Sequence, residues 1–211
     1  MDSMNKLIND IDNYYSKKIT KFGITPKGVD WNNVETQDVR FQQLLKVVNM
    51  KTHFSINDLG CGYGSIISFL TKNDFSNFSY YGYDFSEQMI SAANEQYPQN
   101  KDYNFFKINS EKELKKADYT IASGIFNVKM HYKEHEWLAY ILKTIEAMSK
   151  FSTKGFAFNI LTKYSDKEYM RNDLYYADPL FFFDYCKRNF SRNVAILHDY
   201  ELYEFTILIR K

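Results

Sequence analysis

The sequence has almost no net charge and no long apolar run. Its 27 Lys and Arg residues balance 26 Asp and Glu residues, which leaves a formal charge of +1 over 211 residues. Nucleic-acid binding depends mainly on cationic contacts to phosphates, so this balance argues against DNA or RNA as a partner. No apolar stretch approaches the roughly 20 residues that cross a bilayer. The first residues, 1–6, contain no apolar signal-peptide core. We therefore expect a cytoplasmic protein without a membrane partner.

Cysteine is scarce as well. Cys61 and Cys186 are far apart, and a disulfide at Cys61 would tether a glycine loop that has to admit a ligand. We predict two free thiols in a reducing compartment. The histidines and carboxylates lack the close spacing of metal ligands, so no metal site is predicted. Aromatic residues, in contrast, are abundant, with 18 Tyr and 18 Phe. We interpret most of them as core and leave open whether the chain is a monomer or a homodimer.

The chain is organised around one glycine-rich run, Asp58-Leu59-Gly60-Cys61-Gly62-Tyr63-Gly64. A strand-like segment precedes this run and an apolar, helix-like segment follows it. Glycine at every second position lets the backbone turn sharply and lie against a ligand. The free N–H groups at the start of the following helix would face that ligand. The run predicts a nucleotide-type site, although its spacing is not the Gly-x-Gly-x-x-Gly of the dinucleotide fingerprint.

Strand-like and helix-like segments alternate from residue 54 onward. The expected strands are Phe54–Leu59, Phe78–Asp84, Tyr103–Ile108, Tyr119–Ser123, Gly155–Leu161, Arg192–His198 and Tyr203–Arg210. The expected helices between them cover about 65–72, 86–96, 111–116, 133–150 and 178–190. Such alternation predicts an α/β fold with a doubly wound, mostly parallel sheet. The last two strands are too close in sequence for a crossover helix, so they must form an antiparallel hairpin.

Two helices are expected before the first strand, at about 3–22 and 36–50, because apolar residues recur there at helical spacing. We interpret residues 1–50 as a helical cap on the main domain, residues 51–211. The polar, tyrosine-rich stretch 162–178 follows the fifth strand and is longer than a usual connection. It is predicted to cover the ligand crevice as a substrate lid, with a purely structural turn as the alternative.

Polar residues follow several strands at the carboxyl edge of the sheet. Asp84 stands 20 residues after Gly64, where an acid can bind both hydroxyls of a ribose. By itself Asp84 could instead cap the helix that opens at Ser86, which is the less favoured interpretation. Asn109-Ser110 follows the third strand and could hold an adenine amino group or ring edge. Ser123-Gly124 follows the fourth strand and would bare backbone beside the amino-acid or sulfonium end of a ligand.

Residues 58–64 together with Gly82-Tyr83-Asp84-Phe85-Ser86-Glu87-Gln88-Met89 resemble the class I S-adenosylmethionine-dependent methyltransferases. The resemblance covers about residues 50–211. It implies a seven-stranded Rossmann-like sheet of order 3-2-1-4-5-7-6 and S-adenosylmethionine as the cofactor. Gly60, Cys61 and Gly62 would then approach the methionine part, Asp84 would bind the ribose diol and Phe85 would stack on adenine. The cofactor-binding residues expected in total are Asp58, Gly60, Cys61, Gly62, Asp84, Phe85, Met89, Asn109, Ser110, Ser123 and Arg40.

The chain departs from that family at one position. Many members carry an aspartate after the third strand to bind the adenine amino group, and Asn109-Ser110 stands there instead. Either side chain could accept that hydrogen bond. An Asn-Pro-Pro-Tyr type sequence, which marks base or glutamine N-methylation in this family, does not follow the fourth strand. Nucleic acid is therefore disfavoured as an acceptor on this ground too.

The N-terminal cap is similar to caps of small-molecule methyltransferases from bacterial surface-sugar pathways. The residues that carry this similarity are Gly28-Val29-Asp30-Trp31-Asn32 and Arg40-Phe41. Arg40 could pair with the cofactor carboxylate, because a guanidinium matches a carboxylate bidentately. Trp31 could form a wall of the substrate pocket. The alternatives are a surface arginine and a packed tryptophan.

Methyl transfer depends mainly on orientation of the acceptor, and a base is needed only if the acceptor loses a proton. His131 follows the fourth strand by a short loop and is the candidate base. Asn127, Tyr175 and Tyr176 are candidate acceptor-binding residues. The leading hypothesis is a methyltransferase for a small molecule, with O-methylation of a sugar or sugar nucleotide favoured. A cofactor-binding partner or regulatory subunit without catalysis is the alternative, and a nicotinamide oxidoreductase is disfavoured by the glycine spacing and the terminal hairpin.

Overall fold

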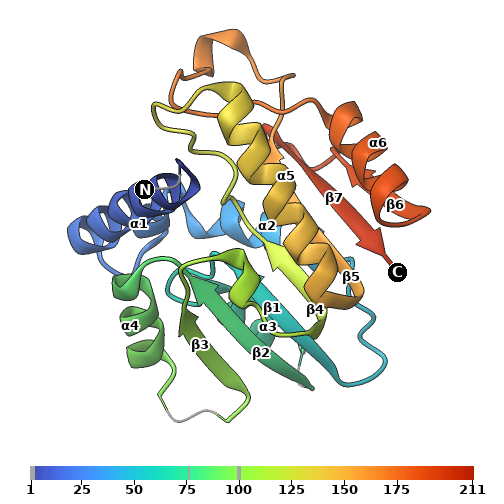
Figure 1. Cartoon of the computed structure of the whole chain (residues 1–211). Coiled ribbons are helices and arrows are strands. Elements are labelled where there is room, and N and C mark those ends of the chain that lie inside the picture. Colours follow the sequence, from blue (N-terminus) through green and yellow to red (C-terminus); the bar gives the residue numbers. More distant parts are fainter. Residues whose placement is uncertain (1–2, 76, 99–100) are drawn as a thin grey trace.

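One seven-stranded sheet forms the centre of the molecule (Figure 1). The computed structural model describes residues 3–75, 77–98 and 101–211. The strand order is β3-β2-β1-β4-β5-β7-β6, and only the pairs that involve β7 are antiparallel. Its strands are β1 (Phe54–Leu59), β2 (Phe78–Asp84), β3 (Tyr103–Lys107), β4 (Ala117–Ala122), β5 (Ser152–Leu161), β6 (Asn193–Leu197) and β7 (Glu204–Arg210). The predicted strand order and the terminal hairpin are confirmed.

Helices cover both faces of the sheet. They are α1 (Ser3–Phe22), α2 (Val34–Leu45), α3 (Ser65–Lys72), α4 (Glu87–Gln96), α5 (Glu134–Phe151) and α6 (Pro179–Asn189), with short 3₁₀ turns η1 (Pro26–Val29), η2 (Glu111–Glu113) and η3 (Lys167–Tyr169). Apolar residues of α2, α3 and α4 share one core cluster with the sheet, and those of α5 and α6 share the other. This arrangement explains why the central strands are apolar on both sides.

Strand β5 illustrates how the sequence builds the two core layers. Phe156 and Phe158 pack on the side of α5 and α6, whereas Ala157 packs on the side of α2 and α3. All three are fully buried. Successive side chains of a strand point to opposite faces, so one apolar run supplies both layers. The bulky pair faces the long helix α5, and the small residue lets α2 lie close to the sheet.

Two predicted helices are shorter in the structure. The helix expected at 111–116 is only the single turn η2, which Ser110 caps by accepting a hydrogen bond from the backbone N–H of Lys112 at 3.3 Å. Leu114 then takes an extended conformation with its side chain 3% exposed, because burial of this leucine outweighs continuation of the helix. The second N-terminal helix ends at Leu45 instead of continuing to residue 50.

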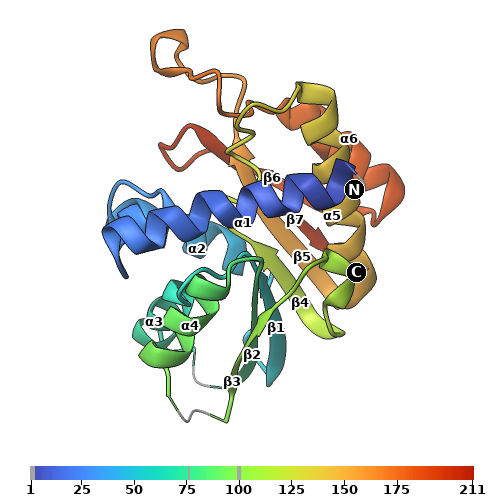
Figure 2. The ribbon, with the colours of Figure 1, turned by 60° about the vertical axis from the view of Figure 1, so that its left-hand side comes forward.

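Helix α1 lies across the carboxyl edge of the sheet (Figure 2). Its middle attaches to the loop after β2, where Ser16 Oγ lies 2.8 Å from Ser86 Oγ. Nearer its N-terminus, Asp10 accepts a hydrogen bond from the hydroxyl of Tyr132, in the loop after β4, at 2.7 Å. These contacts hold α1 over the ends of β2 and β4, where the ligand crevice of an open α/β sheet lies.

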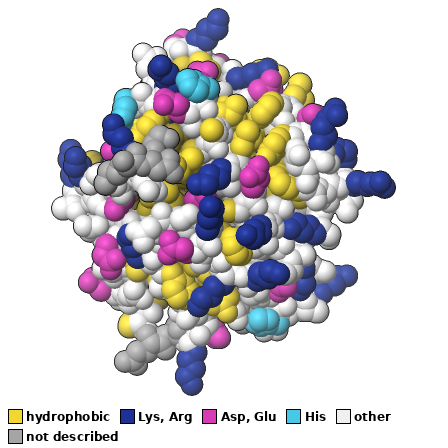
Figure 3. Space-filling view, in the orientation of Figure 1, with side chains coloured by type: hydrophobic (Ala, Val, Ile, Leu, Met, Phe, Trp, Pro, Cys, Tyr) yellow, Lys and Arg dark blue, Asp and Glu magenta, His cyan; other side chains and the backbone are white. Residues whose placement is uncertain are grey.

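The surface carries charges of both signs. On the face of Figure 3, Lys and Arg side chains are interspersed with Asp and Glu. No helix in the described ranges is long and apolar enough to span a membrane.

Candidate functional site

A cavity of about 400 Å³ opens at the carboxyl edge of the sheet, beneath α1. Its floor is the glycine loop, the loops after β2 and β4, and Leu161 at the end of β5. Ile11 and Tyr15 of α1 line it from above, and Tyr169, Arg171 and Leu174 line it from the stretch 162–178. The segment expected to act as a lid therefore forms part of the cavity wall. A pocket of this size and position suits a nucleotide-sized ligand.

The glycine loop joins β1 to α3 and requires glycine at Gly60. Its φ angle is +77°, a left-handed backbone conformation that residues other than glycine rarely adopt. A Cβ atom at this position would lie 2.2 Å from Cγ2 of Ile125. The backbone N–H of Gly60 donates to the carbonyl of Tyr83 at 2.7 Å, which ties the loop to the end of β2. The loop can thus pass close to both a ligand and the loop after β4.

Asp84 closes the loop from β2. Its two carboxylate oxygens accept hydrogen bonds from the backbone N–H groups of Gly62 and Ser86, each at 2.9 Å. Burial raises the pKa of Asp84 to about 6, and those backbone hydrogen bonds oppose the rise. A hydrogen bond from the backbone N–H of Phe85 also lowers this pKa. Of the four lone-pair sites of the carboxylate, at least one is therefore left for a ligand.

Asp58 lies beneath the loop and is 4% exposed. Its carboxylate accepts a hydrogen bond from the Tyr80 hydroxyl at 2.7 Å. Burial raises the pKa of Asp58 to about 7; the Tyr80 hydrogen bond lowers it and the charge of Asp84 raises it further. Burial likewise raises the pKa of the Cys61 thiol well above its usual value. Cys61 is therefore a small apolar wall of the cavity and not a reactive thiolate.

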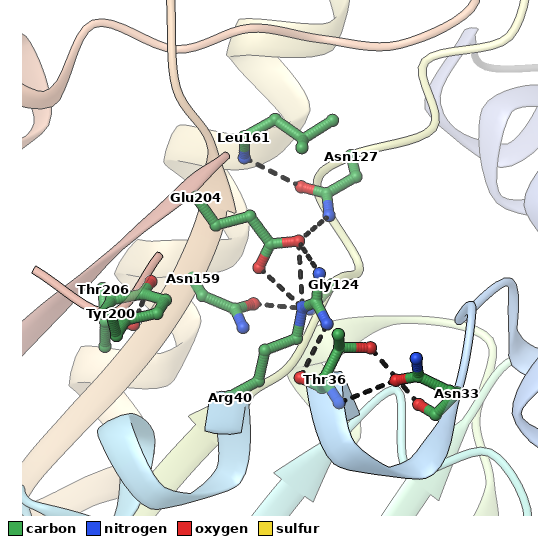
Figure 4. A network of polar contacts seen from close by, with 10 residues as sticks. All are labelled: Asn33, Thr36, Arg40, Gly124, Asn127, Asn159, Leu161, Tyr200, Glu204 and Thr206. Carbon is green, nitrogen blue, oxygen red and sulfur yellow. Dashed lines mark hydrogen bonds and ion pairs between the residues drawn. The ribbon is translucent and has the colours of Figure 1, made fainter. Parts of the chain in front are cut away.

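The far end of the cavity holds an ion pair between Arg40 of α2 and Glu204 of β7 (Figure 4). Arg40 Nε lies 3.0 and 2.9 Å from the two oxygens of Glu204, and Nη2 lies 2.8 Å from Oε1. The third nitrogen, Nη1, donates to the carbonyl of Thr36 at 2.7 Å. The Asn127 amide adds a bond to Glu204 Oε1 at 3.4 Å. A charged pair this deeply buried needs such a full set of partners.

Trp31 covers this ion pair. The guanidinium carbon of Arg40 lies 4.0 Å from the centre of the Trp31 ring. The ring also rests on the backbone of Gly124, which has a φ angle of +74° and where a Cβ atom would lie 2.3 Å from Trp31 Cζ2. The backbone N–H of Gly124 donates to Asn159 Oδ1 at 2.7 Å. Cap residues and the loop after β4 thus form one wall.

The structure brings most of the predicted site residues to this cavity. Those that line it are Asp58, Gly60, Cys61, Gly62, Asp84, Phe85, Met89, Ser123, Arg40, Trp31 and Asn127. Ser123 Oγ is buried and has no hydrogen-bond partner among the described residues. Arg40 and Asn127, however, already bind Glu204 and are not free side chains.

Five predicted residues do not line the cavity. Three of them lie in the loops after β3 and β4. His131 is 67% exposed and lies with Nε2 3.9 Å from Asp10 of α1. Asn109 is exposed, with its side chain bonded to Lys107. Ser110 caps η2 instead. The loops after β3 and β4 turn these side chains toward solvent or toward their own backbone.

The other two are the tyrosines of the stretch 162–178. Tyr175 is 9% exposed and packs in the core beside α5 and α6. Its backbone N–H donates to the carbonyl of Asn127 at 2.8 Å, which draws this part of the stretch inward. Tyr176 accepts a hydrogen bond from the backbone N–H of Arg171 through its hydroxyl. The stretch meets the cavity through Tyr169, Arg171 and Leu174, one to seven residues earlier than predicted.

Sequence reasoning also missed Glu204, Ile11 and Tyr15. Glu204 begins β7 and is followed by a run of buried, mostly apolar residues. An acid in such a position indicates that it pairs with a buried cation. Ile11 and Tyr15 follow the helical spacing of α1, which indicates a buried face but not what it covers. In the described part of the chain, no group of three or more His, Cys, Asp and Glu residues is placed to hold a metal ion.

Comparisons with known proteins agree with this geometry. Residues 57–148 match a family model described as a methyltransferase domain. The chain is 47% identical over 167 residues to the putative methyltransferase Rv1506c of Mycobacterium tuberculosis, a match that covers 79% of this chain and 99% of the relative.

Solved structures share the fold. Magnesium protoporphyrin IX methyltransferase (ChlM) from Synechocystis PCC 6803 with bound SAH superposes with a TM-score of 0.65 at 17% identity, over 96% of this chain and 99% of that chain. The DhpI-SAM-HEP complex superposes with a TM-score of 0.66 at 12% identity, over 97% and 98% of the two chains.

Proposed function

The chain belongs to the class I S-adenosylmethionine-dependent methyltransferases, and we propose that its methyl acceptor is a small molecule. O-methylation of a sugar or sugar nucleotide is the favoured reaction. The single observation that carries the proposal is the cavity that joins the glycine loop and Asp84 to a separate polar end at Glu204. One end suits the donor, and the other leaves room for an acceptor.

The residues at the donor end fit S-adenosylmethionine. Asp84 keeps an acceptor position beside its backbone hydrogen bonds, which suits a ribose hydroxyl. The backbone of Gly60 and Gly62 lies at the cavity wall without side chains in the way, and Phe85 offers a ring for adenine. When bound, the cofactor supplies an electrophilic methyl group on a positively charged sulfur.

The charge of the cavity favours that cation. Its lining contains four carboxylates (Asp30, Asp58, Asp84 and Glu204) and two arginines (Arg40 and Arg171). Aromatic rings of the helical cap, Tyr15 and Trp31, also line the cavity, and ring faces attract cations. A sulfonium is therefore favoured over the neutral thioether that remains after transfer.

Arg40 retains a role toward the cofactor in this proposal. A guanidinium has five N–H bonds. In this chain Glu204 takes one from Nε and one from Nη2, and the Thr36 carbonyl takes one from Nη1. One N–H therefore remains on each of the two terminal nitrogens. These two N–H groups can donate to the two oxygens of the cofactor's methionine carboxylate.

A polar acceptor is supported by the far end of the cavity. Asn127 lines it together with the ion pair, and Asn32 and the exposed Tyr169 also line the cavity. The amides and the tyrosine hydroxyl suit the many hydroxyl groups of a sugar. The alternative is a cofactor-binding partner without catalysis, for which the same donor end would suffice.

The test combines binding with turnover. We expect S-adenosylmethionine and S-adenosylhomocysteine to raise the melting temperature, and NAD to leave it unchanged. Incubation with S-adenosylmethionine and a panel of sugar nucleotides should then release S-adenosylhomocysteine with at least one of them. No stabilisation by either methyl-donor species would refute the donor assignment. Stabilisation without turnover on sugars, phenols or amines would favour the non-catalytic alternative.

A further inference from the structure

Glu204 is a buried carboxylate that no cofactor role uses. It is 1% exposed, yet it lines the cavity. It begins β7 directly opposite Leu161, the last residue of β5. Leu161 donates its backbone N–H to Asn127 at 3.1 Å, and Asn127 binds Glu204 in turn. The carboxylate is thus held rigidly at the carboxyl edge of the sheet (Figure 4).

The hydrogen bonds of Glu204 are distributed unequally between its two oxygens. Oε1 accepts from Arg40 Nη2 at 2.8 Å and from the Asn127 amide at 3.4 Å, and it shares the single Nε–H of Arg40 with Oε2. Oε2 accepts from Arg40 Nε alone among the described residues. A carboxylate oxygen has two lone-pair sites. Oε2 therefore has one site left, on a residue that lines the cavity.

The other three carboxylates of the cavity are committed elsewhere. Asp30 binds the Tyr14 hydroxyl and the Lys18 ammonium. Asp58 lies beneath the glycine loop and binds Tyr80, as described above. Asp84 holds two backbone N–H groups and is the proposed ribose ligand. No histidine is among the residues that line the cavity.

The place of Glu204 in the sheet separates it from the ribose end. Asp84 ends β2, and the order from there is β2-β1-β4-β5-β7. Ser123, with its unpartnered hydroxyl, follows β4 between the two carboxylates. A donor that extends from Asp84 over the glycine loop would present its methyl group toward Ser123. The acceptor then occupies the remaining space, which Glu204 bounds.

We propose that Glu204 binds the acceptor hydroxyl through Oε2 and takes its proton during methyl transfer. This inference rests on the proposed function and identifies the residue that serves the acceptor. As the bond between the acceptor oxygen and the methyl carbon forms, the sulfur–carbon bond breaks and sulfur keeps its electron pair. The hydroxyl proton passes to Glu204, so the positive charge of the sulfonium is balanced by neutralisation of the carboxylate. Glu204 thus takes the role that the sequence assigned to His131.

The ion pair with Arg40 does not prevent this role. A hydroxyl oxygen that has received a methyl group is a protonated ether, which is a far stronger acid than any carboxylic acid. Even a carboxylate stabilised by a guanidinium accepts that proton once the new bond is largely formed. Arg40 in turn fixes the orientation of Glu204 through the hydrogen bonds of its Nε and Nη2.

The test needs no knowledge of the acceptor. Sinefungin replaces the methylsulfonium of the cofactor by a carbon that carries a protonated amine, in the position of the transferred methyl group. If Glu204 faces that position, the wild type binds sinefungin more tightly than S-adenosylhomocysteine by about tenfold to a hundredfold, the effect of one charge-assisted hydrogen bond. Glu204→Gln removes most of this preference, because any disturbance of Arg40 weakens both ligands alike and leaves the ratio of their affinities to report on Glu204. Calorimetry measures both affinities.

Two further variants make the outcome decisive. Glu168→Gln makes the same chemical change at an exposed carboxylate of the cavity-forming stretch and should keep the full preference. Glu204→Asp keeps the charge but withdraws it by one methylene, and it serves if Glu204→Gln does not fold. An unchanged sinefungin preference in the Glu204 variants overturns the inference. Equal loss of both ligands also overturns it, because the role would then be structural. Failure of the wild type to bind S-adenosylhomocysteine refutes the proposed function itself.

Discussion

The replacement Gly60→Ala tests the geometry of the glycine loop most sharply. The left-handed conformation at φ +77° costs a residue with a Cβ atom about 1–2 kcal/mol. The new methyl group would also lie 2.2 Å from Ile125 Cγ2, and such overpacking costs about 1–3 kcal/mol. We expect a total loss of about 2–5 kcal/mol in the free energy of unfolding. This loss is a large fraction of the stability of a typical domain.

Equilibrium urea denaturation measures the loss, and a second replacement separates its two causes. Ile125→Ala removes the atom that the new methyl group meets, but it leaves the backbone angle unchanged. The double variant should therefore lose only the backbone contribution of about 1–2 kcal/mol beyond Ile125→Ala alone. A loss below about 0.5 kcal/mol in Gly60→Ala would refute the reasoning, since substitutions at ordinary surface positions change stability by that much. So would strict additivity of the two replacements.

Three other changes follow from the structure. Burial raises the pKa of Asp58 to about 7, so folding takes up protons between about pH 4 and pH 7. The free energy of unfolding of the unliganded protein should therefore fall as the pH rises through this range. In denaturation curves, Asp58→Asn should make this fall smaller by up to about 4 kcal/mol. Gly124→Ala should displace Trp31, whose ring the new Cβ would meet at 2.3 Å, and a shift of tryptophan fluorescence would report it, whereas an unchanged spectrum would contradict the contact. Tyr132→Phe removes the hydrogen bond to Asp10 and should lower the free energy of unfolding by about 0.5–1.5 kcal/mol. It should also speed hydrogen exchange in α1. Unchanged exchange would show that this bond does not hold the helix.

The sequence predicted the fold well because the signals for it are local. The glycine run, the acid that ends β2 and the short link before β7 each determine their own neighbourhood. Together with the resemblance they lead to one strand order, which the structure confirms. The expected helix at 111–116 was wrong because burial of Leu114, a tertiary effect, overrides local helix propensity.

The site was predictable where its residues directly follow strands. Gly60, Asp84 and Ser123 lie at the cavity because strand ends share one edge of the sheet. The ion pair between Arg40 and Glu204 joins residues 164 positions apart, and no spacing rule connects them. Only the oddity of a lone acid at the start of an apolar strand pointed to it.

The lid shows a second limit of sequence reasoning. The stretch 162–178 does reach the cavity, but its backbone pairs through bridges from Leu174 to Val128 and from Ala177 to Thr162, and Tyr175 between them is buried in the core. Which tyrosines face a ligand therefore depends on long-range pairing. Composition alone gave no means of choosing Tyr169.

Calorimetric titration of S-adenosylhomocysteine into the wild type and Asp84→Asn tests the central claim most directly. Asparagine keeps the shape of the side chain but loses the charged acceptor that we assign to the ribose. The account predicts one binding site per chain and an affinity about tenfold to a hundredfold weaker in Asp84→Asn. No binding to the wild type, or equal affinities in the two proteins, would contradict the account.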